Sequence, residues 1–119
     1  MTTHQDRCRE FRRLHESGCF VIPNPWDLGS ARVLAQLGFP ALATTSCGFA
    51  WTIARPDHGV SLDEMLVHLR AISEGVAVPV NADFERGFAT APEIAGHGTF
   101  THLSRAVPHP EVNRSFTPQ

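Results

Sequence analysis

The chain has 119 residues, a length that predicts one domain with a modest hydrophobic core. A formal charge of -2 with 42% hydrophobic and 18% charged residues is typical of an ordinary globular protein, and it lacks the basic excess that nucleic-acid binding requires. All ten basic residues are arginine, which excludes lysine-dependent chemistry such as Schiff-base formation within this chain.

The N-terminal segment is polar and rich in arginine, and no run approaches the ~20 apolar residues of a membrane span. We therefore expect a cytoplasmic protein without a membrane partner. Cys8, Cys19 and Cys47 are odd in number and widely spaced, so they fit neither a zinc ribbon nor a disulfide framework. Such cysteines are expected to act as small apolar side chains in a reducing compartment.

Helical periodicity and short apolar runs alternate along the first 83 residues. They predict helices over 6–16, 26–39 and 61–75, and strands over 19–24, 40–46 and 76–83. Asp27 is placed to cap the second helix, and Ser61 with Glu64 forms a capping box at the start of the third. The stretch "CGFAWTIARPDHGV", residues 47–60, is expected to be a long loop.

The three expected strands are apolar throughout instead of alternating with polar residues. Such strands are covered on both faces, which indicates a parallel sheet with right-handed crossovers and the α/β class. Ligands of parallel sheets bind at the carboxyl ends of the strands. Here these ends are Asn24–Asp27, Thr44–Gly48 and Asn81–Glu85.

Asn81 and Asp83 lie two residues apart on an expected strand, so both side chains point to the same face. Their amide and carboxylate oxygens suit Mg²⁺ or Mn²⁺, which take one or two protein carboxylates and keep several waters. The alternative is that the pair caps the turn that follows the strand.

The segment Thr44–Gly48 offers hydroxyl groups and accessible backbone amides, which can hold a carboxylate or a phosphate. A plain turn is the alternative. Cys47 also raises the hypothesis of a nucleophile activated by His58, although no local signature supports it. Asp57, in "ARPDHG", either forms a turn or acts together with residues that are near only in space.

The pattern changes beyond about Ile94, where helical periodicity ends and prolines scatter. His97, His102 and His109 fit no compact zinc pattern. We expect a domain over 1–94 and an irregular tail over 95–119 that is disordered or derives from a frameshift.

From about Phe11 to about Ile94, the motifs "FVIPNPWDLGSARVLAQLGFPALATTSCGFAW", "RPD", "SLDEML" and "VPVNADFERGF" keep their order and spacing. Together they resemble the isocitrate lyase and phosphoenolpyruvate mutase superfamily, in particular its small bacterial branch. The resemblance implies about three βα units from the N-terminal part of a TIM-type (β/α)8 barrel, an incomplete one. It also implies enzymes that make or break C–C or P–C bonds in 2-oxo or 2-hydroxy acids through a pyruvate enolate, usually with Mg²⁺.

The resemblance also assigns roles residue by residue. It implies that the substrate carboxylate is bound by Thr45, Ser46, Cys47 and Gly48. It also implies a loop aspartate near the metal, Asp57, and a pair of metal ligands, Asp83 and Asn81. Asn81 departs from the aspartate usual in the family, and the loss of one negative charge is expected to weaken metal binding. Cys47 departs from a usual glycine or alanine.

Three functions follow as hypotheses. The first is a Mg²⁺-dependent lyase or mutase acting on a small 2-oxo or 2-hydroxy acid, as a homo-oligomer or together with an intact homologue. The second is a truncated, non-catalytic remnant of such an enzyme. The third is a metal-dependent aldolase that also binds 2-oxo acids, which product analysis would separate from the first.

Overall fold

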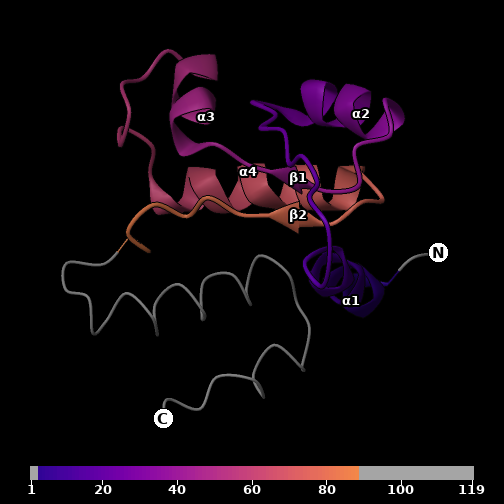
Figure 1. Ribbon diagram of the computed structural model, residues 1–119. Coiled ribbons are helices and arrows are strands. Elements are labelled where there is room, and N and C mark those ends of the chain that lie inside the picture. The colour runs from indigo at the N-terminus through magenta and orange to yellow at the C-terminus, as the bar shows by residue number, and fades with distance from the viewer. Residues whose placement is uncertain (1–2, 89–119) are drawn as a thin grey trace, which may run out of the picture. The chain divides into compact units, whose positions relative to one another are not determined.

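The structure, a computed structural model, describes residues 3–88. Its helices and strands, in chain order, are α1 (His4–Leu14), α2 (Leu28–Gln36), β1 (Leu42–Ala43), α3 (Ser46–Thr52), α4 (Leu62–Gly75) and β2 (Val80–Asn81) (Figure 1). The chain divides into two compact units, Met1–Asp83 and Phe84–Gln119, and all six elements belong to the first.

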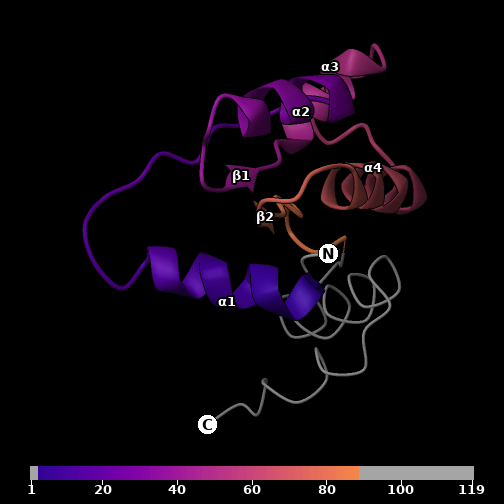
Figure 2. The same cartoon turned by 90° about the vertical axis from the view of Figure 1, so that its right-hand side faces the viewer.

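Strands β1 and β2 form a parallel two-stranded sheet, in which Leu42 pairs with Val80 and Ala43 pairs with Asn81. The chain crosses from one strand to the other through α3 and α4. In both views the strands lie between α1 on one side and α2 and α3 on the other (Figures 1 and 2). The prediction of the α/β class with a parallel sheet is therefore confirmed for this unit.

The first expected strand, 19–24, is wrong as a strand, although the segment does run beside β1. The backbone N–H of Ala43 donates to the carbonyl of Pro23 at 3.1 Å, and the side-chain amide of Asn24 donates to the carbonyl of Ala43 at 3.0 Å. Pro23 and Pro25 have no N–H to donate, so a regular ladder cannot continue through this segment.

Two helices begin at the residues that the sequence predicts. The Asp27 carboxylate accepts a hydrogen bond from the backbone N–H of Ser30 at 2.7 Å and so caps α2. Gly38, just beyond the end of α2, has a φ of +91°, a conformation that favours glycine. The capping box of Ser61 and Glu64 is present at the start of α4.

Helix α3 corrects the expectation of a loop over 47–60. Thr45 is its N-cap, since the Thr45 hydroxyl oxygen accepts a hydrogen bond from the backbone N–H of Gly48 at 3.2 Å. The helix is only seven residues long, too short to show an apolar stripe in the sequence. The remainder of the expected loop, from Ile53 to Val60, contains no helix or strand.

The core lies where α2 and α4 pack on β1. Ala31, Leu42, Ile72 and Val76 form its buried centre. Burial of a side chain such as Leu42 or Ile72 contributes about 2 kcal/mol. Five further apolar side chains, partly buried, pack against this centre: Leu34, Ala35, Phe39, Val78 and Val80.

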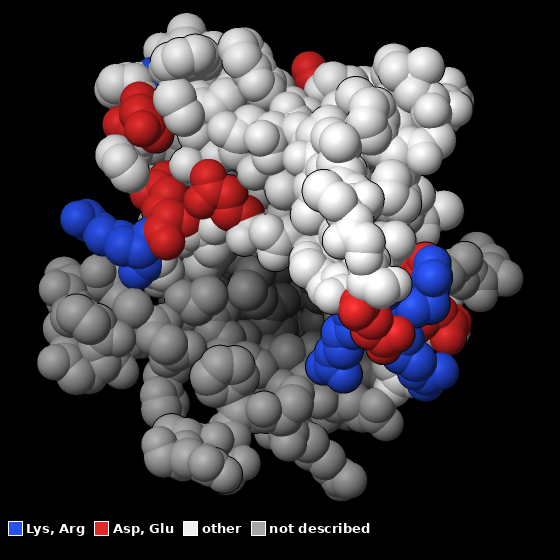
Figure 3. All heavy atoms as spheres, in the orientation of Figure 1, with Lys and Arg blue, Asp and Glu red and all other residues white. Residues whose placement is uncertain are grey.

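Helix α1 is polar, and none of its residues is buried. Its surface carries mixed positive and negative side chains (Figure 3), including the ion pair of Arg13 with Glu10 at 2.5 Å. Arg7 joins α1 to the end of α4, because its guanidinium donates to the carbonyls of Ser73 and Val76. This contact ties α1 to the rest of the unit without burying any of its residues.

The second unit contributes five described residues, 84–88. They form a turn in which the backbone N–H of Gly87 donates to the carbonyl of Phe84 at 2.9 Å, and the rings of Phe84 and Phe88 pack with centroids 5.1 Å apart. The predicted boundary at 94, the tail over 95–119 and its three histidines lie outside the described residues. Within 3–88, no helix is long and apolar enough to cross a membrane.

Candidate functional site at the strand ends

The carboxyl ends of β1 and β2 are joined by side-chain hydrogen bonds. One carboxylate oxygen of Asp83, Oδ2, accepts from the backbone N–H of Ser46 at 3.0 Å and from the Ser46 hydroxyl at 2.9 Å. In return, the backbone N–H of Asp83 donates to the hydroxyl oxygen of Thr44 at 2.9 Å. The parallel register brings these residues together, since Thr44 and Ser46 follow β1 and Asp83 follows β2.

The two hydroxyl residues of this contact are buried, with only 3% of Thr44 and 8% of Ser46 exposed. Buried polar groups are costly unless they are hydrogen-bonded, so the contact with Asp83 satisfies groups that would otherwise destabilise the fold. Hydrogen bonds to an ionised carboxylate are also stronger than neutral ones. The strand ends are therefore held in a defined geometry.

The segment Thr45–Gly48 turns sharply from β1 into α3 and has no room for a side chain at Gly48. A Cβ there would lie 2.6 Å from Cδ1 of Trp26 and 2.7 Å from Cγ2 of Thr45. The Trp26 indole covers this position, and its ring packs edge-to-face on that of Trp51, with centroids 5.7 Å apart. Trp26 thus covers the start of α3 and Trp51 belongs to its last turn, while 47% of Trp26 and 57% of Trp51 remain exposed.

Cys47 lies within this turn, partly buried. Burial raises the pKa of the Cys47 thiol, and the negative charge of Asp57 raises it further. The thiol is therefore protonated near neutral pH, which argues against the nucleophile hypothesis because the thiolate is the reactive form. The role of Asp57 beside a metal ion, which the resemblance implies, stays a prediction.

Asp57 itself is exposed, in the loop between α3 and α4. Its carboxylate accepts a hydrogen bond from the backbone N–H of His58 at 3.0 Å, and its other oxygen lies 3.7 Å from Nε2 of His58. His58 thus faces Asp57, and its φ of +61° is uncommon for a residue with a side chain. This local geometry fits the turn-forming interpretation of Asp57, and its functional role stays a prediction.

Asn81 pairs through its backbone, since its carbonyl accepts from the N–H of Thr44 at 2.9 Å, while its side chain is exposed. Within the described part of the chain, no three His, Cys, Asp or Glu side chains are grouped so that they could hold a metal ion. The oxygen donors of Asp83, Asn81 and Asp57 nevertheless have the right chemistry for Mg²⁺, which keeps several waters and needs few protein ligands. The donor set fits a hydrated Mg²⁺ and does not fit a closed cage.

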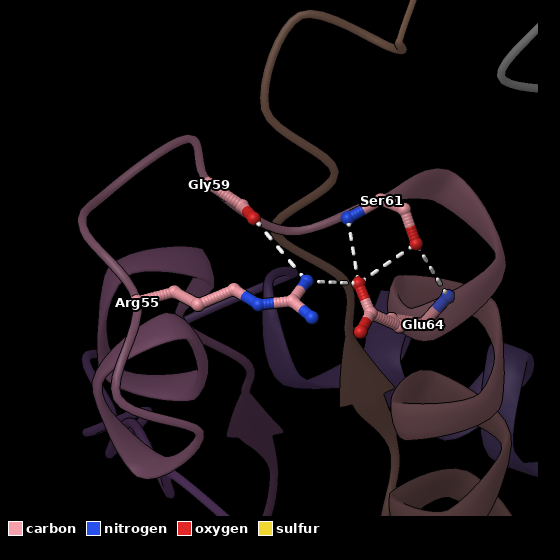
Figure 4. A network of polar contacts seen from close by, with 4 residues as sticks. All are labelled: Arg55, Gly59, Ser61 and Glu64. Atoms are coloured by element: carbon pink, nitrogen blue, oxygen red, sulfur yellow. Dashed lines mark hydrogen bonds and ion pairs between the residues drawn. The ribbon is translucent and has the colours of Figure 1, made fainter.

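A second polar network stabilises the loop that carries Asp57 (Figure 4). Oε2 of Glu64 accepts from the backbone N–H of Ser61 at 3.0 Å, from the Ser61 hydroxyl at 2.8 Å and from the Arg55 guanidinium at 2.5 Å. Arg55 also donates to the carbonyl of Gly59 at 3.4 Å. These contacts lower the pKa of Glu64 to about 2, chiefly through the backbone N–H of Ser61.

The sequence of this chain matches the family model of phosphoenolpyruvate phosphomutase over residues 11–98, which include every residue of the strand-end contact. The chain belongs to this family. A 2,3-dimethylmalate lyase of Eubacterium barkeri is 37% identical over 76 residues, which cover 62% of this chain and 26% of that enzyme. An oxaloacetate decarboxylase of Pseudomonas savastanoi pv. phaseolicola is 33% identical over 107 residues, which cover 87% of this chain and 36% of that enzyme.

Among solved structures, a protein described as a lyase/mutase from Burkholderia cenocepacia J2315 is 44% identical and superposes with a TM-score of 0.78. The match covers 84% of this chain and 36% of that protein. The chain thus spans about a third of the length of the relatives that it matches. The predicted membership of the isocitrate lyase and phosphoenolpyruvate mutase superfamily is confirmed.

Three further residues of this chain were not among the predicted site residues. Thr44 was noted only as a strand-end hydroxyl, and Arg55 gave no signal because its partner Glu64 is nine residues away. His68 was not singled out as a functional residue in the sequence, yet it is buried. The helical spacing could have predicted the burial of His68, since this residue shares one face of α4 with Met65 and Ile72.

Proposed function

We propose that this chain carries part of the active site of a Mg²⁺-dependent carbon–carbon lyase that acts on a small 2-oxo or 2-hydroxy acid. The observation that carries the proposal is the contact of Thr44, Ser46 and Asp83, which fixes a carboxylate and a hydroxyl-bearing turn at the carboxyl ends of adjacent parallel strands. The names of the relatives, oxaloacetate decarboxylase and 2,3-dimethylmalate lyase, favour C–C bond cleavage in a dicarboxylic acid.

Asp83 and Asn81 would hold the Mg²⁺, with Asp57 close to it and to its waters. The ion would supply positive charge to the oxygens of the 2-oxo acid, where negative charge develops as the C–C bond breaks. Within this chain, Ser46 holds the Asp83 carboxylate in place through two hydrogen bonds. Asp83 is therefore preorganised and need not reorient when the site is filled.

The turn Thr45–Gly48 would bind the substrate carboxylate. The Cys47 thiol, protonated because its pKa is raised, serves there as a weak hydrogen-bond donor without a negative charge that would repel the substrate. Trp26 lies against Gly48 in the same turn and would shield that side of a bound carboxylate from water. Exclusion of water strengthens the electrostatic interactions that hold a carboxylate.

Calorimetric titration of the chain with oxalate, in the presence and absence of Mg²⁺, tests the proposal. Oxalate is a planar dicarboxylate that mimics the acid end of an enolate, and we expect it to bind only when Mg²⁺ is present. Asp83→Asn keeps the size of the side chain and removes its charge, so Mg²⁺-dependent oxalate binding should fall at least about tenfold. Asp63→Asn, which removes an exposed carboxylate in the first turn of α4, is the matched control and should bind as the native chain does.

A second measurement separates catalysis from binding alone. The release of pyruvate from oxaloacetate, and the products formed from 2,3-dimethylmalate, would be followed at saturating Mg²⁺. Release of pyruvate that Asp83→Asn abolishes supports the lyase. Oxalate binding without any turnover would instead support a non-catalytic remnant, and an aldol product from a 2-oxo acid and an aldehyde would support the aldolase. If oxalate does not bind at any Mg²⁺ concentration, the proposal is wrong.

A further inference from the structure

His68 lies on the buried face of α4, and its ring stacks on the ring of Phe49 from α3. The two ring centroids are 3.7 Å apart and the rings are nearly parallel, with an interplanar angle of 8°. Only 8% of His68 is exposed, and its Nε2 has no hydrogen-bond partner within the described part of the chain. A buried imidazole in this setting packs as a flat apolar ring, a role that its neutral form fills and its cation does not.

The charges around His68 come from the elements packed against it. Burial lowers the pKa of His68, while the Asp27 carboxylate at the start of α2 acts in the opposite direction and is the weaker influence. On α3 the titratable residue is Cys47, whose thiol is protonated near neutral pH. On α4 itself, Glu64 lies one turn before His68, but its carboxylate is bound by Ser61 and Arg55.

Phe49 connects His68 to the candidate site. The backbone N–H of Phe49 donates to the carbonyl of Thr45 at 3.0 Å, in the first turn of α3. The next residue, Ser46, makes both hydrogen bonds to Asp83. A displacement of Phe49 is therefore transmitted over a single helical turn to the residues that hold the strand ends together.

We propose that His68 is a positioning residue whose neutral ring holds Phe49, and with it α3 and the turn Thr45–Gly48, and that protonation of His68 releases this turn. The inference deepens the proposed function, on which it rests for its catalytic consequence, because it makes the carboxylate-binding turn sensitive to pH. The packing itself is measurable without substrate or Mg²⁺. The stabilising contribution is complete above the ordinary histidine pKa of about 6.5, and it is lost as the pH falls through the lowered pKa of His68.

Both tryptophans of the chain report on α3, which makes intrinsic fluorescence a direct readout. Trp51 belongs to α3, and Trp26 lies against Gly48 in its first turn. The tryptophan emission of the native chain would be titrated from pH 8 to pH 4.5, with far-ultraviolet circular dichroism recorded in parallel. We expect a change in emission with a midpoint below pH 6.5, before any loss of helical signal.

Two variants and two controls assign this transition. His68→Phe keeps a flat ring on Phe49 and cannot be protonated, so the transition should disappear. Asp27→Asn retains a residue that caps α2 well but removes the charge that favours the cation, so the midpoint should move to a lower pH. His15→Gln and His58→Gln remove exposed histidines and should leave the midpoint unchanged.

The outcomes are decisive in both directions. An emission that is constant down to pH 4.5, or a transition that survives in His68→Phe, would overturn the inference. If His68→Phe does not fold, the shift in Asp27→Asn decides, because a transition that owes nothing to His68 has no reason to respond to that charge. Oxalate binding is measured separately, so a chain with the transition but without Mg²⁺-dependent binding would sink the proposed function and leave the role of His68 intact.

Discussion

Two polar clusters of similar composition stabilise this chain, and they differ in how far they reach along the sequence. The cluster at the strand ends joins Ser46 to Asp83 across 37 positions. The cluster at the start of α4 joins Glu64 to Ser61 and Arg55, which lie three and nine positions away (Figure 4). In each, one carboxylate oxygen accepts both a backbone N–H and a serine hydroxyl.

Because the bonded residues differ in their separation along the sequence, the two clusters depend on different parts of the fold. The Glu64 cluster completes a helix start and closes a loop, so it forms as soon as that segment folds. The Asp83 cluster exists only when β1 and β2 have paired in the correct register, because a slip by one residue would turn Asp83 to the other face. The strand-end cluster therefore depends on the tertiary fold, and its loss should cost more than the loss of the local one.

Replacement of Asp83 by alanine is expected to have the largest effect. It removes two charge-assisted hydrogen bonds and leaves the buried Ser46 hydroxyl without its partner, so the free energy of unfolding should fall by about 3 kcal/mol. Urea unfolding followed by circular dichroism measures it, and Asp63→Ala is the control, since Asp63 is exposed on α4. A loss below about 1 kcal/mol would mean that the cluster contributes no more than an ordinary surface contact.

Replacement of Gly48 by alanine should come next, because the new methyl group would lie 2.6 Å from the Trp26 indole. Trp26 is half exposed and is free to move outwards, so we expect a cost of about 1–2 kcal/mol and a change in tryptophan emission. Gly29→Ala in α2 is the matched control, since the nearest atom to its Cβ would be Oδ1 of Asp27 at 3.4 Å. If both variants lose the same free energy of unfolding and show the same tryptophan emission, the contact with Trp26 does not explain the cost of Gly48→Ala.

The contrast between near and distant contacts also describes what the sequence could predict. Asp27, and Ser61 with Glu64, were predicted as helix starts, since a capping residue bonds a group only three residues away. The parallel sheet was predicted from the apolar runs. The hydrogen bonds between Ser46 and Asp83 were not predicted, because they require the register of β1 and β2 in addition to their existence.

The errors have physical causes as well. Helix α3 was missed because seven residues that include Gly48 carry no helical periodicity, and its start depends on the hydroxyl of Thr45. The segment 19–24 has the composition of a strand, yet Pro23 and Pro25 prevent a ladder. The roles of Asn81, Asp57 and the turn Thr45–Gly48 stay predictions, since these depend on a bound acid and metal ion.

Within the local cluster, Ser61→Ala should have a smaller effect than either change at the strand ends. It removes the hydroxyl that bonds both the N–H and the carboxylate of Glu64, while Arg55 still holds that carboxylate. Loss of an N-cap serine destabilises a helix by about 1 kcal/mol. Thermal unfolding of this variant, with Ser17→Ala at an exposed position outside the helices as control, gives the value. A cost as large as that of Asp83→Ala would erase the distinction between the two clusters.

Glu64→Gln should have the smallest effect at neutral pH and a clear one on the pH dependence of stability. Because the pKa of Glu64 is lowered from 4.5 to about 2, its contribution is complete above pH 4.5 and is lost as the pH falls through about 2. The glutamine keeps a carbonyl oxygen for the Ser61 hydroxyl but cannot lose a charge, so the decline in stability between pH 4.5 and pH 2 should become shallower. Urea unfolding at pH steps across that range measures the slope, and Glu74→Gln, at an exposed position near the other end of α4, should leave it unchanged. An unaltered slope in Glu64→Gln would mean that other carboxylates dominate acid unfolding. The strand-end carboxylate of Asp83 would then be the first to test.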